Sequence, residues 1–165
     1  AAQTGTLSVM VGAGRTTFEQ LEPLIRCFAS DITHCGDVGT GQIAKIMNNM
    51  VLFQTVNALA EALVVGERAG IDPALLLATL AKGSANSFAL NNHGMKAMLP
   101  GHFPERAFST EYAQKDNAYA LALAREVGVR LRGAELTAAI LEETIAAGYG
   151  ANYFPVLKKV IDRAP

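Results

Sequence analysis

Three polar residues that open a long apolar segment have types and spacings that suit catalysis. Lys45 is followed by Asn48 and Asn49 at three and four residues, so an α-helix would place them on one face. The residues that continue this face are apolar, so the lysine and the amides lengthen a core-facing stripe. Desolvation of an ammonium costs free energy and lowers its pKa toward the range of an acid/base catalyst. On spacing alone a second interpretation is favoured, in which Lys45 reaches solvent and the asparagines are caps or surface residues.

A glycine-rich segment, G-D-V-G-T-G at residues 36–41, precedes this lysine. Glycines between a strand and a helix allow a backbone to approach a ligand closely, as in phosphate-binding turns. The order G-x-x-G-x-G is the reverse of a dinucleotide fingerprint, and no Lys-Ser/Thr pair follows as a P-loop requires. The glycines alone therefore do not predict a phosphate site.

A second pair of charged residues, Lys115 and Asp116, lies early in a predicted helix that Ser109 would cap. Asp116 shares its helix face with apolar residues, which favours a partly buried carboxylate; the alternative is an ordinary first-turn charge. Phe108 could line a pocket, although an aromatic residue before a helix more often packs on the core. The three histidines show neither HExxH spacing nor a nearby carboxylate, so no metal site is expected.

The elements needed to position these residues can be predicted from periodicity and caps. The chain is predicted to begin with a strand at residues 6–11, then a helix capped by Thr16 or Thr17, then a short strand at residues 32–35. Pro23 is an irregularity in the predicted helix. Only helices follow, the first of them long and apolar on nearly every face. They are predicted at residues 43–66, 74–82, 109–126, 133–147 and 153–163, with residues 84–107 irregular or in short helices. The fold class expected is mainly α, with a strand-helix-strand segment before an all-helical domain.

The composition excludes several classes of protein. Of the 165 residues 50% are apolar and 18% charged, with a formal net charge of -1, whereas intrinsic disorder needs lower hydrophobicity and higher net charge. Near-neutral charge without a long basic run argues against nucleic acid or an anionic membrane as the main partner. No stretch reaches the roughly 18 consecutive apolar residues of a membrane span. Two cysteines form no disulfide framework, and no secretion signal is recognisable, so a cytoplasmic location is expected.

The beginning of the chain predicts that a preceding segment exists. The sequence opens on Ala1 without an initiator methionine, and two short strands do not form an independently stable sheet. We therefore expect residues 1–36 to be the end of an N-terminal nucleotide-binding domain and residues 37–165 to be a complete helical domain.

Taken together, residues 5–12, residues 36–41 leading to Lys45 and Asn49, and the pair Lys115-Asp116 resemble the β-hydroxyacid dehydrogenase family, which includes 3-hydroxyisobutyrate dehydrogenase. The similarity covers essentially the whole chain. The resemblance implies a Rossmann domain first and an all-helical substrate and dimerisation domain second, joined by a long helix.

The resemblance also implies roles for individual residues. Lys45 would be the catalytic lysine, taking the hydroxyl proton during oxidation and protonating the carbonyl oxygen in reduction. Asn49 would hold the substrate or the lysine in place. The sister family of 6-phosphogluconate dehydrogenases carries a histidine where this chain has Asn48, which favours a small hydroxyacid over a sugar phosphate. Further substrate contacts are expected from Asn48, Gly39 and Phe108.

Cofactor and partners follow from the same resemblance. Lys115 would contact NAD or NADP with Asp116 in support, most of the cofactor site lying in the preceding domain. The substrate would be a small hydroxyacid or its semialdehyde, the assembly a homodimer or higher homo-oligomer, and the chain alone would be inactive. The alternative function is a non-catalytic helical dimerisation or interaction module, suggested by the all-round apolar helix at residues 43–66.

Overall fold

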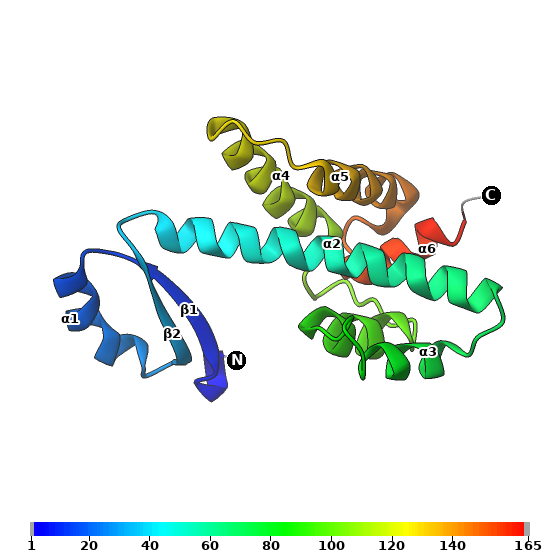
Figure 1. Cartoon of the computed structure of the whole chain (residues 1–165), viewed down its shortest axis with the longest axis horizontal. Helices are drawn as coiled ribbons and strands as arrows, with labels where there is room; N and C mark the ends of the chain where they lie inside the picture. Colours follow the sequence, from blue (N-terminus) through cyan, green and yellow to red (C-terminus); the bar gives the residue numbers. More distant parts are fainter. Residues whose placement is uncertain (1, 164–165) are drawn as a thin grey trace. The chain divides into compact units, whose positions relative to one another are not determined.

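The computed structural model describes residues 2–163 and has two compact units, Ala1–Asn48 and Asn49–Pro165, each of which is described by itself. The chain is 65% helical, with a two-stranded parallel sheet before the main helices (Figure 1). This confirms the predicted fold class, which is mainly α with a strand-helix-strand segment first.

The first unit is built around that small sheet. A 3-10 turn, η1 (Ala2–Thr4), precedes β1 (Leu7–Gly12), α1 (Arg15–Ile25) and β2 (Ala29–Gly36). The strands pair in parallel, which requires a crossover, and α1 provides it beside them (Figure 1). Phe18 anchors α1, because its buried ring stacks on His34 of β2 with centroids 4.6 Å apart.

Two predictions for this unit need correction. Neither Thr16 nor Thr17 caps α1; the helix begins at Arg15, so both threonines lie within its first turn, and the N-cap is Gly14, which has no side chain to cap with. Pro23 lies inside the last turn of α1, where it removes one backbone N–H donor, and the helix ends two residues later, at Ile25. The second strand is also longer than predicted, since it pairs with β1 from Ala29.

The long helix, α2 (Thr40–Arg68), starts and ends beyond the predicted residues 43–66. By length and composition alone it could cross a membrane, with an 18-residue window of mean hydropathy 1.3, of which 44% is buried. This differs from the sequence-based expectation, because a window average tolerates Gln54, Asn57 and Glu61 whereas a count of consecutive apolar residues does not. Core helices of soluble proteins pass the same test.

The second unit continues with α3 (Pro73–Leu80), the π-helix η2 (Leu90–Met98), α4 (Thr110–Glu126), α5 (Arg132–Thr144), the π-turn η3 (Ile145–Tyr149), the 3-10 helix η4 (Phe154–Leu157) and α6 (Lys158–Ile161). Two predicted caps are confirmed. The Asp72 side chain accepts a hydrogen bond from Leu75 N at 2.8 Å, and Ser109 Oγ accepts one from Tyr112 N at 3.2 Å.

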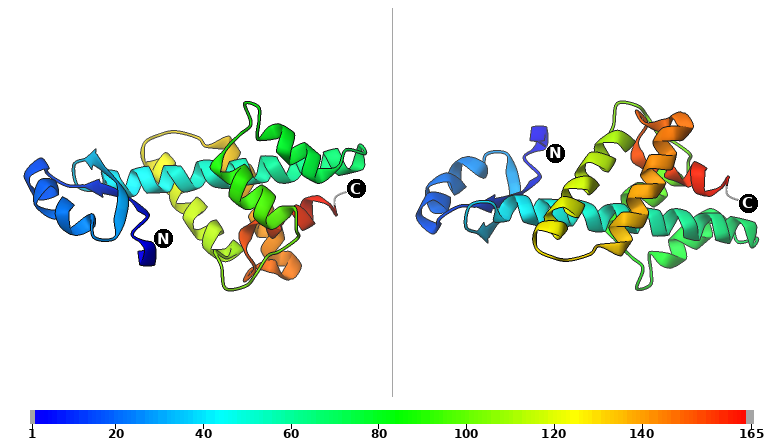
Figure 2. Two further views of the ribbon diagram at one scale, coloured as in Figure 1. Left: turned by 90° about the horizontal axis from the view of Figure 1, so that it is seen from below. Right: turned by 90° about the horizontal axis from the view of Figure 1, so that it is seen from above.

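Helices of the second unit surround the part of α2 that belongs to it. Figures 1 and 2 show α4 and α5 on one side of α2 and α3 with η2 on the opposite side. Phe53, Val56 and Leu63 of α2 are fully buried between them. They form the core together with Leu77, Leu90, Leu141, Phe154 and Leu157.

In the second unit, the bounds and types of several helices differ from those predicted. The helix predicted at residues 133–147 is α-helical only to Thr144, because the chain then widens into η3, within which Gly148 has a φ of +89°. The segment predicted at residues 153–163 splits into η4 and α6, with Pro155 in the first turn of η4. Residues 84–107, expected to be irregular or in short helices, contain the nine-residue π-helix η2, which agrees with the second of these alternatives.

Candidate functional site

The glycine-rich segment forms the turn between β2 and α2 in the first unit. Gly36 and Gly39 have φ values of +116° and +98°, which side-chain-bearing residues adopt only at a cost in free energy. Gly41 is required for a different reason, because a Cβ there would lie 2.5 Å from the Met10 carbonyl oxygen of β1. Thr40 Oγ1 donates to the Asp37 carbonyl at 2.7 Å and closes the turn. Each glycine therefore has a structural role, while Gly39, around which a Cβ would meet nothing within 4 Å, leaves open space beside the turn.

Lys45 follows in the second turn of α2, where it is exposed, as is Asn48. Of the two interpretations of Lys45, the one in which its side chain reaches solvent agrees with this exposure, and the one with a buried ammonium is wrong. Burial on this face begins one turn later, at Asn49, which is 8% exposed because a carboxylate of α4 lies beside it. The lysine thus remains accessible to a ligand, and the amide that follows it is fixed inside the second unit.

Asn49 and Asp116 form a buried polar contact between α2 and α4. Asn49 Nδ2 donates to Asp116 Oδ2 at 2.8 Å, and both residues are 8% exposed. The other carboxylate oxygen of Asp116 lies 3.8 Å from Lys115 Nζ. Adjacent residues of a helix point about 100° apart, so Asp116 faces the core while Lys115 remains exposed on the surface of α4.

Aromatic rings lie on the other side of Lys115. Its Nζ is 3.5 Å from the ring centroid of Tyr112 and 5.9 Å from that of Tyr119. Desolvation lowers the pKa of Lys115, but Tyr112, Asp116 and Tyr119 together outweigh it and raise the pKa above its ordinary value. Lys115 therefore carries its positive charge at neutral pH, which suits binding of an anionic or carbonyl oxygen and not proton abstraction.

Phe108 is half-buried immediately before α4. Its ring packs edge-on against Tyr112 with centroids 5.0 Å apart and also contacts Phe53 and Phe154 at 5.9 and 5.8 Å. Phe108 therefore joins the core, as one of the two sequence interpretations expected, and at the same time supports a residue that contacts Lys115.

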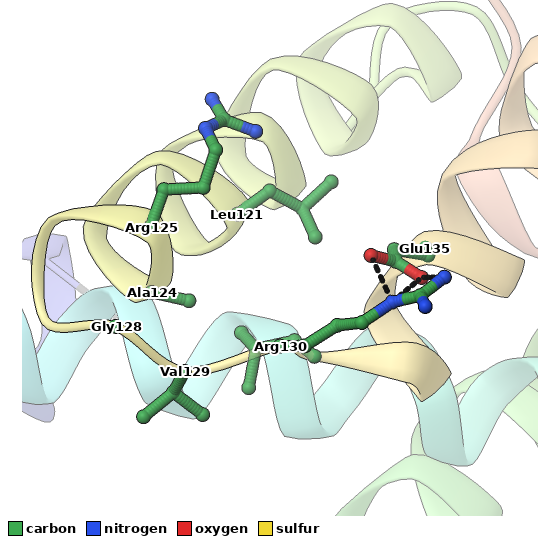
Figure 3. A pocket seen from close by; sticks show the side chains of 8 residues that line it. Leu121, Ala124, Arg125, Gly128, Val129, Arg130 and Glu135 are labelled. Atoms are coloured by element: carbon green, nitrogen blue, oxygen red, sulfur yellow. Dashed lines mark hydrogen bonds and ion pairs between the residues drawn. The ribbon is translucent and has the colours of Figure 1, made fainter.

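A surface pocket of about 360 Å³ lies at the other end of α4, where the chain turns into α5 (Figure 3). None of the predicted site residues lines it. Its polar wall is an ion pair, in which the Arg130 guanidinium donates to both carboxylate oxygens of Glu135 (Figure 3). The remaining lining is largely apolar: Leu121, Ala124, Val129 and Leu131, with Arg125 and Gly128 at the turn. Since its two facing charges already neutralise each other, this pocket is a weaker candidate site than the cluster around Lys115.

The structure thus brings Asn49, Lys115, Asp116 and Phe108 together in the second unit, while Gly39, Lys45 and Asn48 belong to the first. Tyr112 was missed by the sequence analysis. Its position three residues before Lys115 places it on the same helix face, and this spacing could have identified it. Within residues 2–163 no group of three or more His, Cys, Asp or Glu side chains could hold a metal ion.

Another arrangement that the sequence did not indicate is the pair His93 and Tyr153. Nδ1 of His93 and the Tyr153 hydroxyl form a short hydrogen bond inside the second unit, and burial lowers the pKa of His93 and raises that of Tyr153. Nε2 of His93 is buried without a hydrogen-bond partner among the described residues.

Residues 39–158 match the family described as "NAD-binding of NADP-dependent 3-hydroxyisobutyrate dehydrogenase", and the chain belongs to this family. The resemblance to β-hydroxyacid dehydrogenases stated from the sequence is therefore confirmed.

Particular relatives show how the similarity is distributed. The 2-(hydroxymethyl)glutarate dehydrogenase of Eubacterium barkeri is 34% identical over 159 residues, which cover 96% of this chain and 52% of the relative. The 3-hydroxyisobutyrate dehydrogenase of Pseudomonas aeruginosa is 37% identical over 134 residues, which cover 76% of this chain and 44% of the relative. A solved 3-hydroxyisobutyrate dehydrogenase from Mycobacterium tuberculosis, with L-serine, has a TM-score of 0.89 at 28% identity and covers 99% of this chain and 57% of that one. The chain spans about half the length of the curated relatives it matches.

Proposed function

We propose that this chain supplies the helical half of an NAD(P)-dependent dehydrogenase that interconverts a small 3-hydroxyacid and its semialdehyde. Membership of the family and the reactions for which its relatives are named support this reaction class. The observation that carries the proposal is the buried hydrogen bond from Asn49 to Asp116, because it fixes one polar site residue of α2 against the helix that presents Lys115.

We infer that Lys45 is the general acid/base. It lies one helical turn before Asn49 on α2, and its exposed side chain is accessible to a small substrate. During oxidation the Lys45 amine would take the hydroxyl proton, and during reduction its ammonium would return a proton to the carbonyl oxygen. Asn49, Asn48, Gly39 and Phe108 would contact the substrate, as the resemblance to the family implies.

The described residues fit a pyridine nucleotide. Lys115 provides an exposed, protonated ammonium that can bind an anionic oxygen of the nucleotide. The rings of Tyr112 and Tyr119 beside it provide flat aromatic surfaces. When bound, the nicotinamide would supply the hydride acceptor or donor. Lys115 would hold an oxygen of the nucleotide, and Asp116 would keep Lys115 in place. We also propose that residues 1–36 complete the nucleotide-binding domain and that the 165-residue chain alone gives no turnover.

Substitution of Lys45 tests the mechanism in the full-length protein. Loss of a general acid/base lowers kcat by roughly 10²- to 10⁴-fold, so we expect Lys45→Ala to show a decrease in this range with an unchanged circular dichroism spectrum. Lys82→Ala is the matched control, because Lys82 is exposed and lies outside the candidate site. A Lys45→Ala enzyme with near-normal kcat would exclude the proposed role.

A second candidate function, self-association, is favoured by the exposed apolar residues of α2. Val51 and Val65 are 57% and 67% exposed, and Ala58 lies midway between them at the seven-residue spacing of a helical contact stripe. We propose that this stripe contributes to a homodimer. Sedimentation velocity of the 165-residue chain tests it: association that Val51→Asp with Val65→Asp abolishes would support the dimer, and a monomer at high micromolar concentration would contradict it.

A further inference from the structure

The ring of Tyr112 lies directly against the ammonium of Lys115 at the start of α4. The distance of 3.5 Å from Nζ to the ring centroid is well inside the roughly 6 Å limit of a cation–π contact. Tyr112 is half exposed, as is Lys115, so the contact faces solvent and is accessible to a ligand. Tyr119 lies farther off, at 5.9 Å, and makes the weaker contact of the two.

Tyr112 is itself held in place by the surrounding structure. Its backbone N–H donates to Ser109 Oγ, the N-cap of α4, at 3.2 Å. Its ring packs edge-on against Phe108, which contacts Phe53 and Phe154 of the core. A ring fixed at both its backbone and its edge loses little further side-chain entropy when it orients a neighbouring cation.

Lys115 is therefore held from two directions by one helix, α2. On one side Asn49 of α2 bonds to Asp116, whose carboxylate lies 3.8 Å from Lys115 Nζ. On the other side Phe53, one turn further along α2, contacts Phe108, which supports Tyr112. The Lys115 side chain, still 46% exposed, has the ring on one side and the carboxylate on the other, so its ammonium can donate to a ligand from solvent.

We propose that Tyr112 is a positioning residue, which uses its ring face to hold the Lys115 ammonium toward an oxygen of the bound nucleotide. The proposal rests on the proposed function, in which Lys115 contacts the cofactor. Tyr112 need not touch the nucleotide, and the ring face, not the hydroxyl, is the group that matters.

Lysine NMR of the 165-residue chain tests the contact without cofactor or turnover. In protein labelled with ¹³C-lysine, the ε-CH₂ signal of Lys115 should be shifted upfield by the ring, retained in Tyr112→Phe and lost in Tyr112→Leu. Tyr149→Leu is the matched control, because the Tyr149 ring lies 5.4 Å from Lys159 Nζ and its loss should move the Lys159 signal and not that of Lys115. An unshifted Lys115 signal in the unaltered chain, or a shift that survives in Tyr112→Leu, would overturn the proposal.

Steady-state kinetics of the full-length protein test the consequence for the cofactor. Since an exposed cation–π contact changes binding by about two- to fivefold, Tyr112→Leu should raise the KM for NAD(P)H by that factor, with a smaller change in kcat. Tyr112→Phe should restore the original KM; failure to do so would assign the effect to the hydroxyl and overturn the ring-face role. If no NAD(P)-dependent turnover exists with any hydroxyacid, the proposed function fails, and the NMR comparison alone decides whether Tyr112 positions Lys115.

Discussion

Asn49 and Asp116, which share a buried hydrogen bond, should show a measurable coupling in the free energy of unfolding. Asn49→Ala removes the Nδ2 donor, and Asp116→Ala removes the carboxylate that accepts from it at 2.8 Å. Hydrogen bonds to charged groups contribute about 1.5–3 kcal/mol to the free energy of unfolding, and the low exposure of both residues places this bond where water competes little. Each single variant should lower stability by about that amount, because each leaves a buried polar group without its partner.

A double-mutant cycle separates this contact from the other interactions of the two residues. Urea unfolding followed by circular dichroism gives the free energy for the chain, the two single variants and the double variant. We expect the double variant to lose clearly less than the sum of the single losses, with a coupling of at least about 1 kcal/mol.

The exposed pair Arg130 and Glu135 provides the matched control cycle. Their side chains are 71% and 41% exposed, so solvent screening should leave a smaller coupling than that of the buried pair. Additive losses for Asn49→Ala and Asp116→Ala would refute the conclusion that this bond fixes α2 against α4, and with it the observation that carries the proposed function.

Two further predictions concern stability and local opening of the backbone. Because burial lowers the pKa of His93, the native state binds fewer protons than the unfolded state at pH values just below the ordinary histidine pKa of about 6.5. The free energy of unfolding should therefore fall as the pH decreases below about 6.5, and the urea midpoint of His93→Gln should fall less steeply with pH than that of the unaltered chain. Equal slopes would contradict a buried, neutral His93. Gly41→Ala should increase amide hydrogen exchange in β1 and the first turn of α2, because its Cβ would meet the Met10 carbonyl at 2.5 Å, whereas Gly14→Ala, with nothing within 4 Å of the added Cβ, should leave exchange unchanged.

The parts of the fold that the sequence predicted well are those determined by local interactions. Asp72 and Ser109 cap their helices as expected, because a cap depends on a side chain and the N–H groups of the next turn. The start of α1 was mispredicted because its N-cap is Gly14, which has no side-chain acceptor, whereas the prediction relied on a threonine hydroxyl as the cap. A short helix was one of two alternatives expected within residues 84–107, but the position and the π-type of η2 were not predictable, since the segment has no periodicity that distinguishes it from irregular chain.

Prediction of the candidate site shows a similar division. Helical spacing correctly placed Asp116 on the buried face of α4, but it could not determine that the carboxylate meets Asn49, a residue 67 positions earlier in the chain. For Lys45 the same reasoning left two interpretations open and favoured the one in which the side chain reaches solvent, and the structure has it exposed. Periodicity identifies a face of a helix, whereas the point along the helix at which burial begins depends on where a distant element crosses it.

The order of Lys115 and Asp116 within their dipeptide has a consequence for how this sequence can vary. Exchanging the two residues would preserve the composition and net charge of the chain. It would nevertheless direct an ammonium at the Asn49 amide N–H groups and a carboxylate at the electron-rich face of Tyr112, so both contacts would become repulsive. An inverted pair at this position in a relative would therefore have to be accompanied by changes both on α2, at Asn49, and one turn earlier on α4, at Tyr112, which makes the dipeptide a sensitive marker of whether the surrounding arrangement is shared.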